Sequence, residues 1–351
     1  MSVLVINFIL VTFFLILYKS NEKNERIAKI LLFLIFTQLL YIKTFADIDS
    51  LPDLISYRDH FEYVQRVDWN DIFVEKTEFG HFILCKLCSL ISGDFRFFLF
   101  VYSFVFLYLY FMWIRKHSVS IPLSILLFLL LTFNGSLYVL RQHMAIAILL
   151  LSYPYIIRRD FISFFIVVCL ASSFHLTAIV FLPVYLFYNI GKWRSMIMAC
   201  LVGGEIAVWM AHNPYLLLAF LSDDSKYTST FDSGDFSTTS TGALISAFFL
   251  MTFIFYIRKK CVLPGYYRLF FYMLIISTVI LFVGIGLPLF PRLASYYSVS
   301  LILIIPLVAT HIQNRYIRLL YVACVLCLET YLAFFTSSAQ DYMAIKMVPC
   351  F

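Results

Sequence analysis

One stretch of the chain, residues 138–189, is almost continuously apolar and is interrupted at only three places. The interruptions are residues 141–143 (RQH), 158–160 (RRD) and 172–175 (SSFH). Because one membrane helix needs only about 20 apolar residues, the stretch is long enough for more than one crossing. The paired arginines of the middle interruption are typical of a cytoplasmic turn. The two outer interruptions should then lie close together at the opposite membrane face.

The rest of the chain has the same character. Hydrophobic residues make up 62% of the 351 residues and charged residues only 13%, and the mean hydropathy is +0.91. A soluble domain is about half apolar and a quarter charged. The composition predicts an all-α polytopic membrane protein, because the apolar runs are continuous and do not alternate with a period of two. The net charge of +6 comes with no basic tail or patch, so we expect no nucleic-acid partner.

We predict about twelve membrane helices that together form a single integral membrane domain, residues 1–351. The expected spans cover residues 2–18, 28–46, 97–114, 121–134, 138–156, 161–174, 176–189, 195–211, 242–257, 267–287, 293–311 and 316–335. More than half of the lysines and arginines lie in short loops near residues 19–29, 115–117, 158–159, 192–194, 258–260 and 311–318. Placing these loops in the cytoplasm gives one consistent alternation, with both termini outside.

Two larger segments are expected at the outer face, residues 47–96 and residues 212–241. The first includes residues 79–92, an apolar stretch that would invert every later loop if it crossed the membrane. Because Lys86 lies in its middle, we interpret this stretch as an interfacial or re-entrant helix. The second segment ends in a run rich in Ser, Thr, Asp and Gly, which is typical of a mobile loop.

Three basic side chains, Arg141, His175 and Arg292, map to this outer face. Arg141 begins a helix, where the helix dipole disfavours a cation and favours an anion, so this end would suit a phosphate. His175 follows a break between two short helices and could transfer a proton near neutral pH. Arg292 lies in a segment broken by prolines and glycines, one helical turn before Tyr296. Each alone is compatible with a side chain that merely reaches the interface, but together they predict a polyanion site.

The segment 47–78 carries nine acids against three bases. Asp53, Tyr57 and Phe61 are four residues apart, so on a helix they share one face. The two aromatic rings could lie on the membrane or under a sugar ring, with Asp53 directed toward polar substrate. The alternative is a solvated acidic helix. Glu78, just before Gly80, lies where the chain returns to the interface.

The eight cysteines predict neither a metal site nor a cofactor. Most lie inside apolar segments, and the CxxC pairs at residues 85–88 and 324–327 lack the four converging ligands of a structural zinc site. We therefore expect no cofactor and no metal cluster, although the acidic first segment leaves a divalent cation open.

A set of short motifs is spread over residues 50 to 300. They are Asp53-x3-Tyr57-x3-Phe61, Glu78-Phe79-Gly80, Leu140-Arg141-Gln142 with Ala145 and Ala147, Ala171-Ser172-Ser173-Phe174-His175 with Leu182-Pro183-Val184-Tyr185, and Pro291-Arg292-Leu293. These motifs resemble those of the EpsG/Wzy-like family of bacterial polysaccharide polymerases. The resemblance is best over residues 78–190.

The resemblance implies a membrane-embedded glycosyltransferase of the GT-C type. Such an enzyme joins oligosaccharide repeats carried on undecaprenyl diphosphate into O-antigen, capsule or exopolysaccharide, at the outer face of the bacterial inner membrane. Both donor and acceptor are then lipid-linked. Arg141 and Arg292 would hold the diphosphate and His175 would assist as a hydrogen-bond donor or proton-transfer group. The residues expected to bind substrate are Asp53, Tyr57, Glu78, Gln142 and Tyr296. The resemblance also implies a separate protein that sets chain length.

Three other functions stay open at this point. A lipid-linked oligosaccharide flippase or other transporter would carry charged residues through the depth of many helices, whereas here most ionisable residues cluster near the faces. An O-antigen ligase would share the donor chemistry but use a lipid A core as acceptor. A purely structural assembly subunit would not need Arg141, His175 and Arg292 together.

Overall fold

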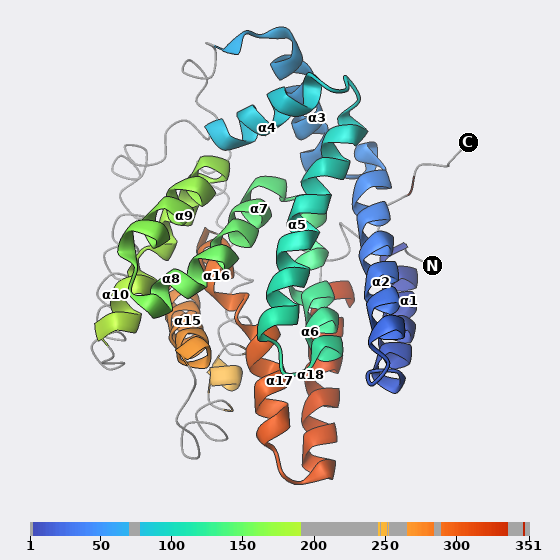
Figure 1. Ribbon diagram of the computed structural model, residues 1–351, viewed down its shortest axis with the longest axis vertical. Coiled ribbons are helices and arrows are strands. Elements are labelled where there is room, and N and C mark those ends of the chain that lie inside the picture. The colour runs from blue at the N-terminus through green and yellow to red at the C-terminus, as the bar shows by residue number, and fades with distance from the viewer. Residues whose placement is uncertain are drawn as a thin grey trace. The chain divides into compact units, whose positions relative to one another are not determined.

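The computed structural model describes residues 3–69, 78–190, 245, 247–250, 252, 265–283, 289–335 and 347 (Figure 1). The chain divides into two compact units. The first unit contains residues 1–153, 162–179 and 312–351, and the second contains residues 154–161 and 180–311.

The described part of the chain is helical throughout and contains no strand, apart from an isolated bridge between Ala46 and Met347. Among the described residues, six helical segments are long and apolar enough to cross a membrane, or up to seven if the bent pair Phe290–Ser298 and Leu301–His311 is one span. The six are α1 (Val3–Ser20), α2 (Glu25–Phe45), α5 (Phe95–His117), Leu140–Arg158, α15 (Gly265–Val283) and α18 (Arg315–Phe335). This confirms the prediction of an all-helical, multi-pass membrane protein.

Three other predicted spans, 121–134, 161–174 and 176–189, coincide with shorter apolar helices. They are α6 (Ile121–Phe128) with the π-helical turn η3 (Leu129–Phe133), then α9 (Phe161–Phe174), then η6 (Leu176–Phe181) with α10 (Pro183–Ile190). The 14 residues of α9 extend about 21 Å at 1.5 Å per residue, less than the hydrocarbon core of about 30 Å. The predicted span 195–211, most of 242–257 and the loop 212–241 lie outside the described residues. The count of twelve spans therefore stays a prediction.

Helix α5 is central to the first unit. It packs against α2, which in turn packs against α1, and it also contacts α6 and the start of α7 (Leu140–Leu149). Aromatic rings fill the buried side of α5, where the Tyr110 ring lies 4.9 Å from that of Phe106 and 4.7 Å from that of Phe128. By contrast, Phe13 and Ile16 on α1 are more than half exposed. A helix that is apolar on its exposed side as well as its buried side is expected in contact with lipid.

The acidic segment after α2 folds into η1 (Ile48–Ser50), α3 (Pro52–Arg66) and α4 (Phe79–Ser89). Within the first unit, α3 and α4 lie at the end where α2 stops and α5 begins (Figure 1). Arg96 in the first turn of α5 donates to the backbone oxygens of Thr44 and Ala46 at 2.9 and 3.3 Å. The last carbonyl groups of a helix have no partner within the helix, so Arg96 satisfies the end of α2 and joins it to α5.

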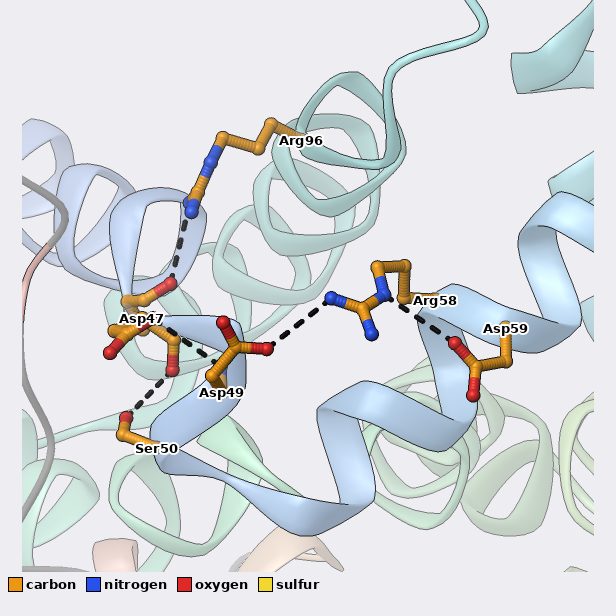
Figure 2. Close-up of polar contacts among 7 residues, drawn as sticks. Asp47, Asp49, Ser50, Arg58, Asp59 and Arg96 are labelled. Atoms are coloured by element: carbon orange, nitrogen blue, oxygen red, sulfur yellow. Dashed lines mark hydrogen bonds and ion pairs between the residues drawn. The ribbon is translucent and has the colours of Figure 1, made fainter.

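Short-range polar contacts order the start of the acidic segment (Figure 2). The Asp47 carboxylate accepts from the backbone N–H of Asp49 at 3.3 Å, and the Ser50 hydroxyl donates to the Asp47 carbonyl at 2.7 Å. The Arg58 guanidinium reaches Asp49 at 3.3 Å and Asp59 at 3.4 Å. Arg58 thereby links η1 to α3, although exposed ion pairs of this kind each contribute less than about 1 kcal/mol.

Lys86, the charge in the middle of the apolar stretch 79–92, has a defined structural partner. Its side chain is buried, and Nζ donates to the backbone oxygens of Val64 at 3.0 Å and Val67 at 2.5 Å. These carbonyls belong to the last turn of α3 and the residue after it, where a cation is favoured by the helix dipole. Lys86 thus ties α4 to the end of α3. The 11 residues of α4 are too few to span a membrane, and its interfacial placement stays a prediction.

The second unit is organised around α15, which packs against α16 (Leu289–Ser298), α17 (Leu301–His311) and α10. The helix axis turns by 52° between α16 and α17. The Tyr297 hydroxyl donates to the Val180 carbonyl, and its ring lies 5.5 Å from that of Phe181. These contacts join α16 to η6 inside the second unit.

Candidate active site

Glu78 joins the two basic side chains that the sequence predicts at one membrane face. Arg141 Nη1 donates to Glu78 Oε2, and His175 Nδ1 lies 2.8 Å from Glu78 Oε1. The backbone N–H of Leu176 also approaches Oε1, at 3.4 Å. Side chains that follow Glu78 by 63 and 97 positions therefore meet at its carboxylate, and the predicted proximity of Arg141 and His175 is present in the first unit.

The Glu78 carboxylate is ionised in this environment. Burial alone would raise its pKa, but the hydrogen bond from His175 and the charge of Arg141 outweigh burial and lower the pKa to about 2. An ionised carboxylate can only accept hydrogen bonds, so Nδ1 of His175 must carry the proton in their contact. When the imidazole is neutral, Nε2 is then the proton acceptor, which is the tautomer that a general base requires.

The meeting of α4 with the end of α9 depends on Gly80. A Cβ atom at this position would lie 2.2 Å from Ser173 Oγ and 2.9 Å from the Ser173 carbonyl oxygen. No side chain fits there unless the backbone moves. Because Glu78 lies two residues before Gly80 and His175 two residues after Ser173, this contact places the carboxylate beside the imidazole.

Arg141 is positioned from two other helices. It lies in the first turn of α7, and the buried hydroxyl of Tyr102 on α5 donates to the Leu140 carbonyl at 2.8 Å. From α3, the Tyr57 ring lies beneath the guanidinium, with 5.6 Å between Arg141 Cζ and the ring centroid. The Arg141 side chain remains 34% exposed, so a ligand can reach the cation. A stacked, ion-paired arginine with remaining exposure suits binding of a phosphate oxygen.

The predicted shared face of α3 is only partly open. Asp53 is exposed, Tyr57 is half-buried and Phe61 is fully buried. The Phe61 ring packs against those of Phe95 and Phe98 on α5, at 5.8 and 5.5 Å. Phe61 is therefore a core residue that holds α3 on α5, and the prediction that it lies on the membrane or under a sugar ring is wrong.

Three further residues complete the predicted set: Gln142, Arg292 and Tyr296. Gln142 is buried in α7, one residue after Arg141, and its role in substrate binding stays a prediction. Arg292 and Tyr296 both lie on α16 of the second unit, one turn apart as expected. Arg292 is exposed, whereas Tyr296 is only 1% exposed. Whether Arg292 joins Arg141 and His175 stays a prediction.

Sequence reasoning assigned no positioning role to Ser173 or Tyr102, and it did not single out the buried His81, whose ring lies 5.6 Å from that of Tyr57. Small residues close to Glu78 and His175 offered a signal for the Gly80–Ser173 contact. Tyr102 carried no signal, because one tyrosine in an aromatic-rich span looks like any other. Glu78 was expected to bind substrate, whereas in the structure its carboxylate contacts both Arg141 and His175.

Comparison with families of known proteins gives one match. The model of the EpsG family matches residues 29–350, which is most of the chain and includes every residue of the cluster. No curated protein and no solved structure matches the sequence significantly.

Proposed function

Because this chain belongs to the EpsG family, we propose that it is a polysaccharide polymerase that joins oligosaccharide repeats carried on undecaprenyl diphosphate. Family membership supports the polymerase-like role. The observation that supports this chemistry is Glu78, whose carboxylate holds Arg141 and His175 side by side. Arg141 is suited to stabilise a leaving diphosphate, and His175 is suited to accept a proton.

In the proposed reaction, the bond between the donor sugar C1 and its phosphate oxygen breaks, and a new bond forms between C1 and an acceptor hydroxyl oxygen. The acceptor proton goes to Nε2 of His175, whose Nδ1–H is held by Glu78. The electron pair of the broken bond leaves with the lipid diphosphate. Arg141 stabilises the charge that develops there, which for one such contact accelerates the reaction by about 10² to 10³.

The wider arrangement is part of the same proposal. The enzyme has a GT-C architecture with about twelve spans and works at the outer face of the bacterial inner membrane. Arg292 supplies the second cation for the diphosphate. Asp53, Tyr57, Gln142 and Tyr296 bind the sugars. A separate partner protein sets the chain length.

The test is a gel of surface glycan from a deletion host that carries each variant on a plasmid. We expect Arg141→Ala, His175→Ala and Arg292→Ala each to abolish the polymer ladder while the protein still inserts into the membrane. Arg58→Ala is the matched control, because Arg58 is a cation of the same acidic face that contacts only exposed carboxylates. A normal ladder from all three site variants would overturn the site assignment.

The deletion host itself separates the rival functions. Loss of the ladder with one capped repeat retained is the result expected of a polymerase. Loss of every repeat would instead indicate a flippase or a ligase. Without a flippase the repeats are not exported, and without a ligase they are not transferred to the final acceptor.

A further inference from the structure

Three side chains with metal-binding atoms meet between α3 and α4, outside the Glu78 cluster. His60 comes from α3, while His81 and Cys85 lie one turn apart on α4. Their nitrogen and sulfur ligand atoms all lie within 4.8 Å of one another. His81 is 1% exposed and Cys85 is fully buried. None of the three has a role in the proposed glycosyl transfer.

One edge of this cluster has the length found in a tetrahedral zinc site. Zinc binds imidazole nitrogen at about 2.0–2.1 Å and thiolate sulfur at about 2.3 Å, so the nitrogen-to-sulfur edge of the tetrahedron is about 3.6 Å. The measured distance from His81 Nε2 to Cys85 Sγ is 3.6 Å. The rings of His60 and His81 stack with 5.4 Å between centroids, so the His60 ring must turn out of this stack to direct a nitrogen at the same ion.

Hydrogen bonding does not account for the burial of His81. Its Nε2 contacts only the weakly polar sulfur of Cys85, and its Nδ1 is buried with no hydrogen-bond partner among the described residues. Around it lie the rings of Tyr57, Phe98 and Tyr102, at 5.6 to 6.2 Å. A buried imidazole with so little hydrogen bonding is costly, and a metal ion at Nε2 would replace the weak contact with sulfur by a strong bond.

We propose that His60, His81 and Cys85 bind one zinc ion, which joins α3 to α4. Two imidazoles and one thiolate are the ligand set that favours zinc over magnesium or calcium, which prefer oxygen. The thiolate offsets one of the two metal charges, and water takes the fourth position. The site uses only one cysteine of the CxxC pair at residues 85–88, because Cys88 is not a member and the second histidine comes from another helix.

The ion would help to position two residues of the Glu78 cluster. Helix α3 carries Tyr57, which stacks on Arg141, and Glu78 is the residue that precedes α4. A metal bridge between the two helices would therefore hold Tyr57 and Glu78 in position relative to each other. Only this consequence rests on the proposed polymerase function, whereas metal binding does not.

The test uses the full-length protein purified in detergent, stripped with a chelator and loaded with ZnCl₂ or CoCl₂. We expect one ion per chain by elemental analysis and, with Co²⁺, the near-ultraviolet absorption of a cobalt–thiolate bond. Cys85→Ser should abolish this absorption, and His60→Gln should weaken binding by about 100-fold or more. Cys88→Ser is the matched control, because Cys88 is a buried cysteine of the same helix outside the cluster.

Thermal unfolding supplies a second readout. Excess Zn²⁺ should raise the Tm of the wild-type and Cys88→Ser proteins, because an ion that binds only the folded state stabilises it, and should leave Cys85→Ser unchanged. Failure of the wild-type protein to retain an ion would overturn the proposal, as would equal metal content in Cys85→Ser. Since neither measurement involves glycan, failure of the polymerase proposal would leave both results unchanged.

Discussion

At Glu78, each oxygen of a single carboxylate contacts a different basic residue. Replacing it by glutamine keeps the shape of the side chain but removes the negative charge. Arg141 would then be partly buried without its counter-ion, and the amide could present an N–H group to His175 Nδ1. The residue therefore sets both the charge balance and the tautomer of the cluster, and these two effects can be measured separately.

We expect Glu78→Gln to abolish the glycan ladder and to destabilise the folded protein by about 1.5–3 kcal/mol, the range for hydrogen bonds to charged groups. The measurements are the surface-glycan gel and thermal unfolding in detergent. Glu62→Gln, an exposed carboxyl of α3, should change neither. A Glu78→Gln protein that makes a full ladder would show that this carboxylate is not needed for polymerisation.

The stabilisation by Glu78 should depend on pH in a defined window. Its pKa is lowered from 4.5 to about 2, so the folded state favours the ionised form. The stabilisation is complete above about pH 4.5 and is lost as the pH falls toward 2. The difference in Tm between the wild-type and Glu78→Gln proteins should therefore be constant from pH 8 to pH 5 and shrink below that. A difference that disappears already at pH 6 would contradict the assignment.

At the scale of elements, the contact between α4 and α9 is the most sensitive to side-chain size. We expect Gly80→Ala to destabilise the protein by about 1–3 kcal/mol and to reduce the ladder, because the added methyl group overlaps Ser173 and separates Glu78 from His175. Gly93→Ala is the control, since a Cβ there meets only the Gln65 side chain at an ordinary 3.6 Å. Equal behaviour of the two variants in thermal unfolding would contradict a close helix contact at Gly80.

Most helices of the described chain could be predicted from the sequence, and some of their partners could not. Hydropathy reports how long an apolar run is, so α1, α2, α5 and α18 appear close to the predicted bounds. It does not report which polar atom a buried charge contacts. Lys86 looked like a charge that kept α4 out of the membrane core, but it is the side chain that closes the end of α3.

The sequence predicted that Arg141 and His175 lie close together, but it did not predict how Glu78 connects them. Charged loops set an alternation that put Arg141 and His175 at one face, and the structure brings them together. The position of Glu78 between them depends on a contact across the fold, at Gly80, that no local pattern encodes. Phe61 shows the converse error, because helical spacing alone does not tell which side of α3 faces α5.

For the whole molecule, the orientation in the membrane is the main prediction still to be measured. We expect alkaline phosphatase fused after Gly93, between α4 and α5, to be active, because that segment is predicted outside. The same enzyme fused after His117, at the other end of α5, should be inactive, and a fluorescent protein there should be bright. The reverse pattern would place the proposed site at the cytoplasmic face and would contradict the orientation that the positive-inside rule predicts.

Helix α18 belongs to the first unit although the whole second unit precedes it in the chain. It packs against η3, and its Phe334 ring lies 5.7 Å from that of Phe8 on α1. During synthesis, the early helices must therefore wait for this neighbour until the intervening residues have been translated. In water, such an uncovered apolar surface would invite aggregation. In a bilayer, lipid tails cover it at little cost, so the order of translation can be tolerated there.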